Sequence, residues 1–366
     1  MFDKIPAGRK LKLNGNLRAI HVTRNEVMVK HGSRSVFSKI YADHANSNII
    51  GPLIRLFSSP MTLDDIFGSG AIDPARRNDV VSLVSMLVED GVLVDAEESH
   101  AQSYYRAVHG ASSPLSQKHV GIVGCGQIGA RVARHLGLLG IGKLTLLDDG
   151  PVPSEKDALR YLGFEIPAVE EAGTLAEALA DGLGHKGQTV VSVLSGERID
   201  EAAAAELFET CDFVVAAFDE YRLSLLHMLN KQALDADKPW VSLYVDGSEA
   251  VVGPIFVPGD TCCFNEFFQQ GLAAAGLLKK EVMTHLDALE SDGSHSFGRV
   301  LPPHADIAAG QLVIGIAEYL TSGRSYLVSR AIRNDFERLS IDYEDIRRLP
   351  RCPACRPFRP FRHVFL

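Results

Sequence analysis

The sequence predicts an α/β fold, in which a doubly wound, mostly parallel, Rossmann-like sheet follows a small winged-helix-like domain. Apolar strand segments alternate with helical segments from about residue 120 to residue 247. A glycine-rich turn joins the first strand of this series to its first helix. A length of 366 residues suits two domains at roughly 100 to 200 residues each. We predict a first domain over residues 1–98 and a second over residues 99–366.

The N-terminal region shows the order of elements expected of a winged-helix-like module. Alternation over residues 17–40 predicts two or three short strands separated by turns. Helical spacing follows over residues 48–59, and Thr62 is placed to cap a second helix. Residues 76–95 predict a longer helix, a glycine that closes it, and a short strand. Residues 96–116 are polar, and we expect them to form a linker loop.

The second region continues the alternation after the glycine-rich turn. Strands and helices that take turns in this way form parallel sheets, because each helix carries the chain back across the sheet. The expected helices cover residues 172–184, 198–210 and 221–237, and the expected strands cover residues 188–195, 211–220 and 239–247.

Composition and charge exclude several classes of partner. The hydrophobic content is 46% and the charged content 23%, as in ordinary globular proteins. The net charge of −9 gives no support for a nucleic-acid or anionic-membrane surface. No apolar run approaches the roughly 18 residues of a membrane span, and the N-terminus has no signal-peptide core. We therefore expect a cytoplasmic protein that binds a peptide or a small molecule.

The glycine-rich turn has the spacing of a nucleotide-binding loop. Gly124, Gly126 and Gly129 follow an apolar strand and open a helix near Gln127, whose free N–H groups suit a phosphate. Asp148 ends the next strand about twenty residues later, where a carboxylate accepts hydrogen bonds from ribose hydroxyls. A tight strand–helix turn in any α/β protein is the alternative. The pattern by itself does not choose between NAD and ATP.

Residues 123–150, taken together with residues 211–264, resemble the ThiF/MoeB-type adenylating family, which includes the ubiquitin-activating enzymes. The resemblance covers about residues 104–320. It implies a protein that binds MgATP and joins a peptide carboxylate to AMP. The N-terminal module resembles the leader-peptide recognition domains of ribosomal peptide natural-product pathways. Together the two parts resemble the enzymes of pantocin A and microcin C biosynthesis, the former more closely.

The resemblance implies roles for four residues. Asp219 takes the place of the aspartate that holds Mg²⁺ near the α-phosphate, and Asp148 that of the ribose-binding aspartate. Arg160 matches the family's phosphate-binding arginine after a one-residue insertion, and Arg106 matches an arginine that the partner subunit supplies to the γ-phosphate. Arg106 therefore implies a homodimer. The alternatives are that Asp219 is a solvated turn aspartate, that Arg160 is a surface arginine and that Arg106 is only a linker arginine.

The phosphate site departs from the family pattern in two places. The family's phosphate-contacting lysine is missing from its expected segment. Lys156 or Lys143 is a candidate replacement, or the activity is altered. Gly150 stands where the family has a second aspartate, which leaves Asp149 as a shifted substitute.

A zinc site is the second expectation from the family. Cys352 and Cys355 keep one CxxC pair, but the other pair is reduced to Cys263. Three thiolates with Glu266 or Cys262 as the fourth ligand could bind structural Zn²⁺, and buried free cysteines are the alternative. No cysteine lies between the two segments, which argues against sulfur transfer or thioester transfer to a ubiquitin-like protein.

These observations predict an ATP-dependent enzyme that binds the leader of a precursor peptide and adenylates a carboxylate in its core. The closer resemblance implies a glutamate side chain and ring closure, whereas the microcin C enzyme implies the peptide C-terminus. A non-catalytic leader-binding scaffold is an alternative that the missing lysine supports. An NAD-dependent oxidoreductase gives no reason for Asp219, Arg106 and residues 258–263 to occur together.

Overall fold

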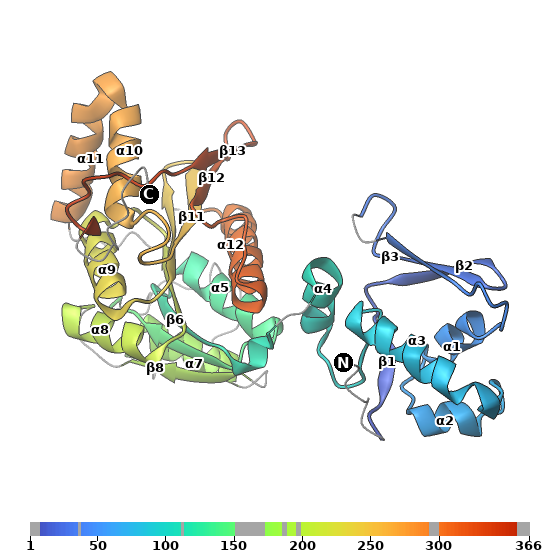
Figure 1. Ribbon diagram of the computed structural model, residues 1–366. Helices are drawn as coiled ribbons and strands as arrows, with labels where there is room; N and C mark the ends of the chain where they lie inside the picture. The colour runs from blue at the N-terminus through green and yellow to red at the C-terminus, as the bar shows by residue number, and fades with distance from the viewer. Residues whose placement is uncertain are drawn as a thin grey trace. The chain divides into compact units, whose positions relative to one another are not determined.

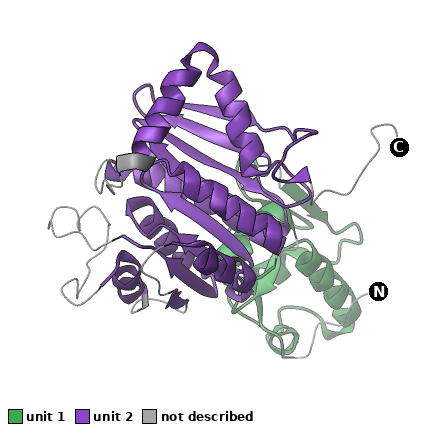
Figure 2. Cartoon of the chain, turned by 90° about the vertical axis from the view of Figure 1, so that its left-hand side faces the viewer, with its two compact units in different colours: residues 1–114 green, residues 115–366 purple. Residues whose placement is uncertain are grey.

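Figure 1 shows the chain as a computed structural model, which describes residues 8–35, 38–110, 113–150, 173–184, 189–194, 199–292 and 300–356. The chain divides into one unit over residues 1–114 and another over residues 115–366 (Figure 2). The sequence predicted this division between residues 98 and 99, so sixteen residues change sides. Each unit has its own β-structure and its own core, and each is described separately below.

The strands of the N-terminal unit form two antiparallel sheets. β2 (Arg18–Thr23), β3 (Glu26–Lys30) and β4 (Ser38–Ala42) form a three-stranded sheet in that order. β1 (Leu11–Leu13) pairs with the strand that closes the unit, β5 (Leu93–Asp95). The two outer strands β2 and β4 each leave one edge unpaired among the described residues.

Three helices lie between these strands in the sequence, which confirms the predicted order of strands, helices and closing strand. They are α1 (Ile50–Leu56), α2 (Leu63–Gly68) and α3 (Arg77–Glu89). Thr62 caps α2 as predicted and forms a capping box with Asp65. Apolar side chains from all three helices and from β3 form a single buried core.

The predicted linker loop is wrong over part of its length, because residues His100–His109 form a helix, α4. The Ser99 side chain caps this helix by accepting a hydrogen bond from a backbone N–H of its first turn. Ala107 packs into the core of the N-terminal unit, and the buried Asn14 amide donates to the Ser103 carbonyl at 2.9 Å. These contacts place α4 in the N-terminal unit and move the boundary to residue 114.

The C-terminal unit contains an eight-stranded sheet in the order β13-β12-β11-β10-β9-β6-β7-β8. The strands from β8 to β10 in this order run parallel, and β11 to β13 are antiparallel, which confirms the mostly parallel sheet. The strand bounds are β6 (His119–Val123), β7 (Lys143–Leu147), β8 (Val190–Val193), β9 (Phe213–Phe218), β10 (Trp240–Asp246), β11 (Glu249–Phe256), β12 (Arg330–Asp335) and β13 (Ser340–Asp345).

Helices cover both faces of this sheet, as in a doubly wound fold (Figure 1). α5 packs against α12 on one face, and α8, α10 and α11 pack around α9 on the other. The helix bounds are α5 (Gln127–Leu138), α7 (Leu175–Gly184), α8 (Glu201–Thr210), α9 (Leu223–Ala236), α10 (Phe264–Ala274), α11 (Lys279–Asp292) and α12 (Pro302–Ser322).

The strand order reverses at β6, which fixes where a ligand can bind. The connection through α5 places β7 on one side of β6, whereas the connection through α8 places β9 on the other side. In open α/β sheets, ligands bind in the crevice outside the carboxyl ends of the strands at such a switch point. Gly124 follows β6 and Asp219 follows β9, so both lie at this edge.

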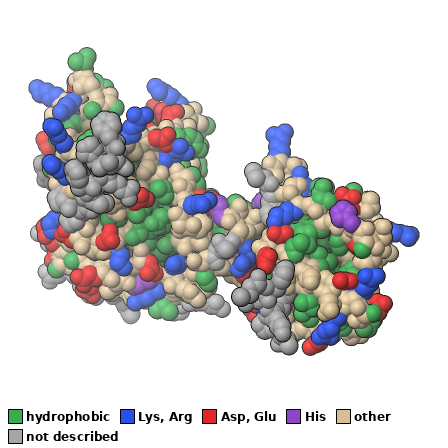
Figure 3. Space-filling view, in the orientation of Figure 1, with side chains coloured by type: hydrophobic (Ala, Val, Ile, Leu, Met, Phe, Trp, Pro, Cys, Tyr) green, Lys and Arg blue, Asp and Glu red, His purple; other side chains and the backbone are tan. Residues whose placement is uncertain are grey.

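The surface carries mixed charge. Figure 3 shows Lys, Arg, Asp and Glu side chains interspersed on the visible face of each unit, with hydrophobic side chains gathered between them. Within the described ranges, no helix combines the length and the hydropathy of a transmembrane segment.

Candidate nucleotide site and metal site

The glycine-rich turn folds back closely onto β9. Gly124 has a φ of +91°, and a Cβ on it would lie 2.3 Å from the Ala217 carbonyl oxygen. A Cβ on Gly129, in the first turn of α5, would lie 1.9 Å from the Gly124 carbonyl oxygen. Only glycine fits at these two positions, because any larger residue would push the helix away from the strand. The sequence pattern therefore reflects a tight contact between β6, α5 and β9.

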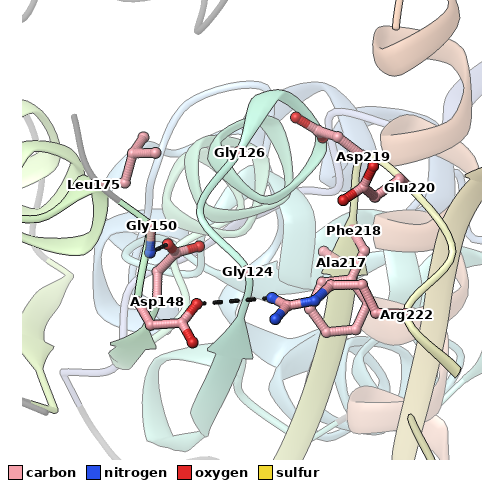
Figure 4. Close-up of a pocket in the computed structure, with 11 residues that line it drawn as sticks. Gly124, Gly126, Asp148, Gly150, Leu175, Ala217, Phe218, Asp219, Glu220 and Arg222 are labelled. Atoms are coloured by element: carbon pink, nitrogen blue, oxygen red, sulfur yellow. Dashed lines mark hydrogen bonds and ion pairs between the residues drawn. The ribbon is translucent and has the colours of Figure 1, made fainter. Parts of the chain in front are cut away.

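A cavity of about 80 Å³ lies at the switch point, beside this turn (Figure 4). Its lining comes from the ends of β6, β7 and β9, and from the start of α7. The predicted residues that line it are Gly124, Gly126, Asp148, Asp149 and Asp219. Gln127 and Gly129, which were also predicted, do not line the cavity but lie in the adjoining first turn of α5.

Asp219 caps the N-terminus of α5. Its carboxylate accepts hydrogen bonds from the backbone N–H groups of Gln127 at 2.8 Å and Ile128 at 2.9 Å. Burial raises the pKa of Asp219 above its ordinary value, although these two hydrogen bonds act in the opposite direction. The hydrogen bonds fix the orientation of the carboxylate, and each oxygen keeps a further lone pair for a cation.

Asp148 lies on the opposite side of the glycine-rich turn and has different partners. Its carboxylate accepts hydrogen bonds from the backbone N–H of Cys125 at 2.5 Å and from that of Gly150 at 2.6 Å. Burial raises the pKa of Asp148, and the neighbouring Asp149 acts in the same direction. The geometry places one half-buried carboxylate at each side of the turn.

Arg222 is a charged residue of this site that was not singled out from the sequence. Its Nη1 lies 3.7 Å from an Asp149 carboxylate oxygen, and its guanidinium carbon lies 5.6 Å from the centre of the Phe218 ring. Among the described residues that line the cavity, it is the single Lys or Arg against Asp148, Asp149, Asp219 and Glu220. The sequence signal that could have revealed Arg222 is its position three residues after Asp219, which directly follows β9.

The other predicted cations do not meet in the described part of this cavity. Arg106 donates to the Glu98 carboxylate at 2.8 and 3.1 Å within the N-terminal unit. Arg160 and Lys156 lie outside the described residues. Lys143 begins β7, about 13 Å from the carboxyl end of that strand at roughly 3.3 Å per residue. The suggestion that Lys143 replaces the missing lysine is therefore wrong.

Three cysteines and a glutamate form a second cluster, in which Cys263, Glu266, Cys352 and Cys355 are all buried. One candidate ligand atom from each lies within 4.8 Å of the others. The Sγ atoms of Cys263 and Cys352 are 3.6 Å apart. Tetrahedral zinc with Zn–S bonds of about 2.3 Å needs about 3.8 Å between sulfurs, so the donor set and its spacing fit zinc.

The hydrogen bonds of this cluster join the C-terminal segment to α10. Glu266 accepts from the backbone N–H of Cys263 at 2.9 Å and from that of Leu349 at 2.5 Å. A hydrogen bond from the Cys355 thiol lowers the pKa of Cys263 below its ordinary value, which favours a thiolate. Cys262 packs into the apolar core instead, so the suggestion of Cys262 as the fourth ligand is wrong and Glu266 takes that position.

Solved structures with the same fold cover nearly the whole chain. E. coli MccB with ATP is 18% identical with a TM-score of 0.62, covering 94% of this chain and 99% of that one. The microcin C7 biosynthetic enzyme MccB in complex with N-formylated MccA is 19% identical with a TM-score of 0.63, over the same shares of the two chains. The heterocyclase TruD is 17% identical with a TM-score of 0.61, covering 95% of this chain and 43% of that one.

Sequence comparison assigns the family. No curated protein sequence gives a significant match. The ThiF family matches residues 104–354, which is more than half of the chain and includes the glycine-rich turn, Asp148, Asp219 and every member of the cysteine cluster except Cys355. The chain therefore belongs to the ThiF family.

Proposed function

We propose that this protein is an ATP-dependent, AMP-forming enzyme that adenylates a carboxylate of a ribosomally made precursor peptide. The observation that carries the proposal is the half-buried Asp219 carboxylate at the N-terminus of α5, in a cavity at the switch point of a ThiF-family sheet. MccB, which shares this fold, has been solved with ATP and with a peptide, MccA.

The proposed reaction places each group at a defined part of the nucleotide. The phosphates lie at the start of α5, where free N–H groups and the helix dipole attract negative charge. Asp148 accepts hydrogen bonds from the ribose hydroxyls, and Asp219 would hold Mg²⁺ beside the α-phosphate. Mg²⁺, when bound, stabilises negative charge on the departing pyrophosphate. A peptide carboxylate oxygen bonds to the α-phosphorus as the bond to pyrophosphate breaks, which gives an acyl-adenylate.

Arg222 compensates for the family's missing lysine in this proposal. Four carboxylates line the cavity, and they would repel a triphosphate without nearby cations. The Arg222 guanidinium stands among them and is partly exposed, with 28% of its side-chain surface accessible. Arg160 from the same chain, and Arg106 from a partner subunit in a homodimer, would add further positive charge.

The peptide partner binds in two places in this proposal. The N-terminal unit takes the leader as an added strand at a free edge of the β2-β3-β4 sheet, where main-chain hydrogen bonds provide affinity. The core peptide then reaches the nucleotide. Activation of a glutamate side chain followed by attack of a nucleophile from the same peptide would close a ring.

The cysteine cluster has a structural role in this proposal. Zinc held by Cys263, Glu266, Cys352 and Cys355 would tie the segment after β13 to α10. None of these four residues lines the nucleotide cavity. In this proposal the metal therefore stabilises the fold and takes no part in the reaction.

The test is peptide-dependent exchange of labelled pyrophosphate into ATP, together with mass spectrometry of the precursor. Exchange with release of AMP supports adenylation. Loss of one water from the peptide supports ring closure at a side chain, whereas an adenylated C-terminus supports the microcin C type of chemistry. Leader binding without nucleotide turnover would support the scaffold alternative, which the missing lysine favours.

A further inference from the structure

A second cavity, of about 210 Å³, lies beside the nucleotide cavity and has a different character. The aromatic side chains of Tyr221, Tyr244, Phe267 and Phe268 form much of its lining. Arg333 is the single Lys or Arg among its described lining residues. None of these residues has a part in the nucleotide site described above.

The two cavities share the turn between β9 and α9. Glu220 and Arg222 line the nucleotide cavity, whereas Tyr221, between them, lines the second cavity. β10 runs parallel to β9 with Tyr244 beside Phe218, the residue before Asp219. Neighbouring strands are about 4.8 Å apart. A peptide whose carboxylate reached the α-phosphate near Asp219 would therefore have its adjacent residue at the mouth of the second cavity.

The interior of this cavity suits an apolar side chain. The Tyr221 and Tyr244 rings lie 4.2 Å apart between centres, and each residue is 7% exposed. An apolar cavity of about 150 Å³ is large enough to bind benzene. A phenyl or indole side chain would therefore fit within 210 Å³ and lose its contact with water.

The charges at the mouth disfavour an acidic side chain. The Arg333 guanidinium already donates to Glu344 at 2.7 Å and to Glu249 at 3.0 Å. Asp246 and Glu249 also line the cavity. An incoming carboxylate would meet like charges and a cation whose charge is already paired with two carboxylates, so the activated carboxylate itself belongs at the nucleotide side.

We propose that this cavity is a specificity pocket that binds a large apolar side chain, preferably aromatic, adjacent to the activated carboxylate of the core peptide. The identity of the ligand as a peptide rests on the proposed function. Binding of the neighbouring side chain would hold the carboxylate near the α-phosphorus and so reduce the entropy lost on reaching the reactive geometry.

Gly271 offers a direct way to fill the pocket. It lines the cavity from α10, and a Cβ on it would meet no atom within 4 Å apart from its chain neighbours and the backbone of its own helix. Gly271→Phe therefore places a ring at the pocket with no backbone strain, whereas Gly271→Ala is the matched control. Both changes replace glycine inside a helix, and circular dichroism with thermal melting verifies that each variant folds.

The experiment uses the full chain and the peptide acetyl-Gly-Xaa-Glu-Gly-amide, with 4-fluorophenylalanine at Xaa as a ¹⁹F NMR probe. We expect the probe signal to broaden with wild type and with Gly271→Ala, and to stay sharp with Gly271→Phe. Competing peptides with Phe at Xaa should bind about tenfold or more tighter than those with Ala or Glu. Equal competition by Phe and Ala, or unchanged broadening with Gly271→Phe, overturns the pocket.

Nucleotide turnover separates this inference from the proposed function. Probe binding is measured without ATP, and AMP formation is measured separately with the same peptides. Selective binding of the aromatic peptide supports the pocket whether or not AMP forms, because this peptide lacks the leader; the absence of pyrophosphate exchange with the full precursor is the result that counts against adenylation. AMP formation at equal rates with Phe and Ala peptides supports adenylation and overturns the pocket.

Discussion

Asp219 and Asp148 are both half-buried carboxylates at the carboxyl edge of the sheet, but their hydrogen bonds point them to different parts of a nucleotide. Asp219 accepts from the first N–H groups of α5, where phosphates bind. Asp148 accepts from the glycine-rich turn and from Gly150, next to the end of β7. Loss of either carboxylate should therefore affect a different step.

Asp219→Ala should lower turnover by about 10²-fold or more, the scale of losing one key electrostatic group. Asp148→Ala should instead raise the Kd for ATP, because it loses the acceptor for the ribose hydroxyls while the phosphate side is unchanged. Pyrophosphate exchange measures the first effect and calorimetry with ATP the second. Equal effects of the two substitutions on both measurements would contradict the separate roles.

Arg222→Ala should weaken ATP binding by about tenfold, the scale of one hydrogen bond to a charged group. Arg222→Lys should recover part of this affinity, because it keeps the charge but loses the planar guanidinium. Arg338, whose side chain is 84% exposed, provides the matched control, and Arg338→Ala should leave the ATP Kd unchanged. An unchanged Kd for Arg222→Ala would show that other cations carry the phosphate charge.

At the scale of the element, the cysteine cluster joins α10 to the segment after β13. The ligand residues come from two parts of the chain, because Cys263 and Glu266 lie at the start of α10 and the CxxC pair follows β13. A metal at this point would close a long loop, and loss of the metal would release its end.

Cys352→Ser should lose zinc and lower the melting temperature, because one thiolate of the tetrahedral set is removed. Metal analysis of the purified protein measures the first effect and calorimetry the second. Cys211→Ala is the control, since Cys211 is buried in the apolar core and should leave the metal content unchanged. Zinc well below one equivalent per chain in the wild type would favour free thiols.

At the scale of the whole molecule, α4 decides where the N-terminal unit ends. Residues 1–98 lack this helix and lose the Ser103 carbonyl that accepts from the buried Asn14 amide. We expect residues 1–114 to unfold cooperatively, and residues 1–98 to be less stable by about 1 to 3 kcal/mol, the cost of an unsatisfied buried group. Urea denaturation measures the difference, and equal midpoints would show that α4 adds nothing to this unit.

Local patterns were sufficient to predict most of the elements. Period-two alternation predicted β2 to β4, helical spacing with Thr62 as a cap predicted α2, and alternating apolar segments predicted the parallel sheet. α4 was missed because Gln102 and Ser103 read as polar surface, whereas both are buried in the N-terminal unit. A local pattern cannot show that a polar side chain is buried when the residues that cover it lie far away in the sequence.

The sequence by itself determined the fold class, the glycine-rich turn and Asp148, because each depends on residue type and on local spacing, whereas Asp219 was singled out through the resemblance to the adenylating family. Tertiary structure decided what meets across the sheet. It placed Arg222 beside Asp149, set Cys263 3.6 Å from Cys352, and put Tyr221 against Tyr244 in a second cavity. Such contacts join residues from separate elements, and they depend on strand order and register, which no short stretch of sequence specifies.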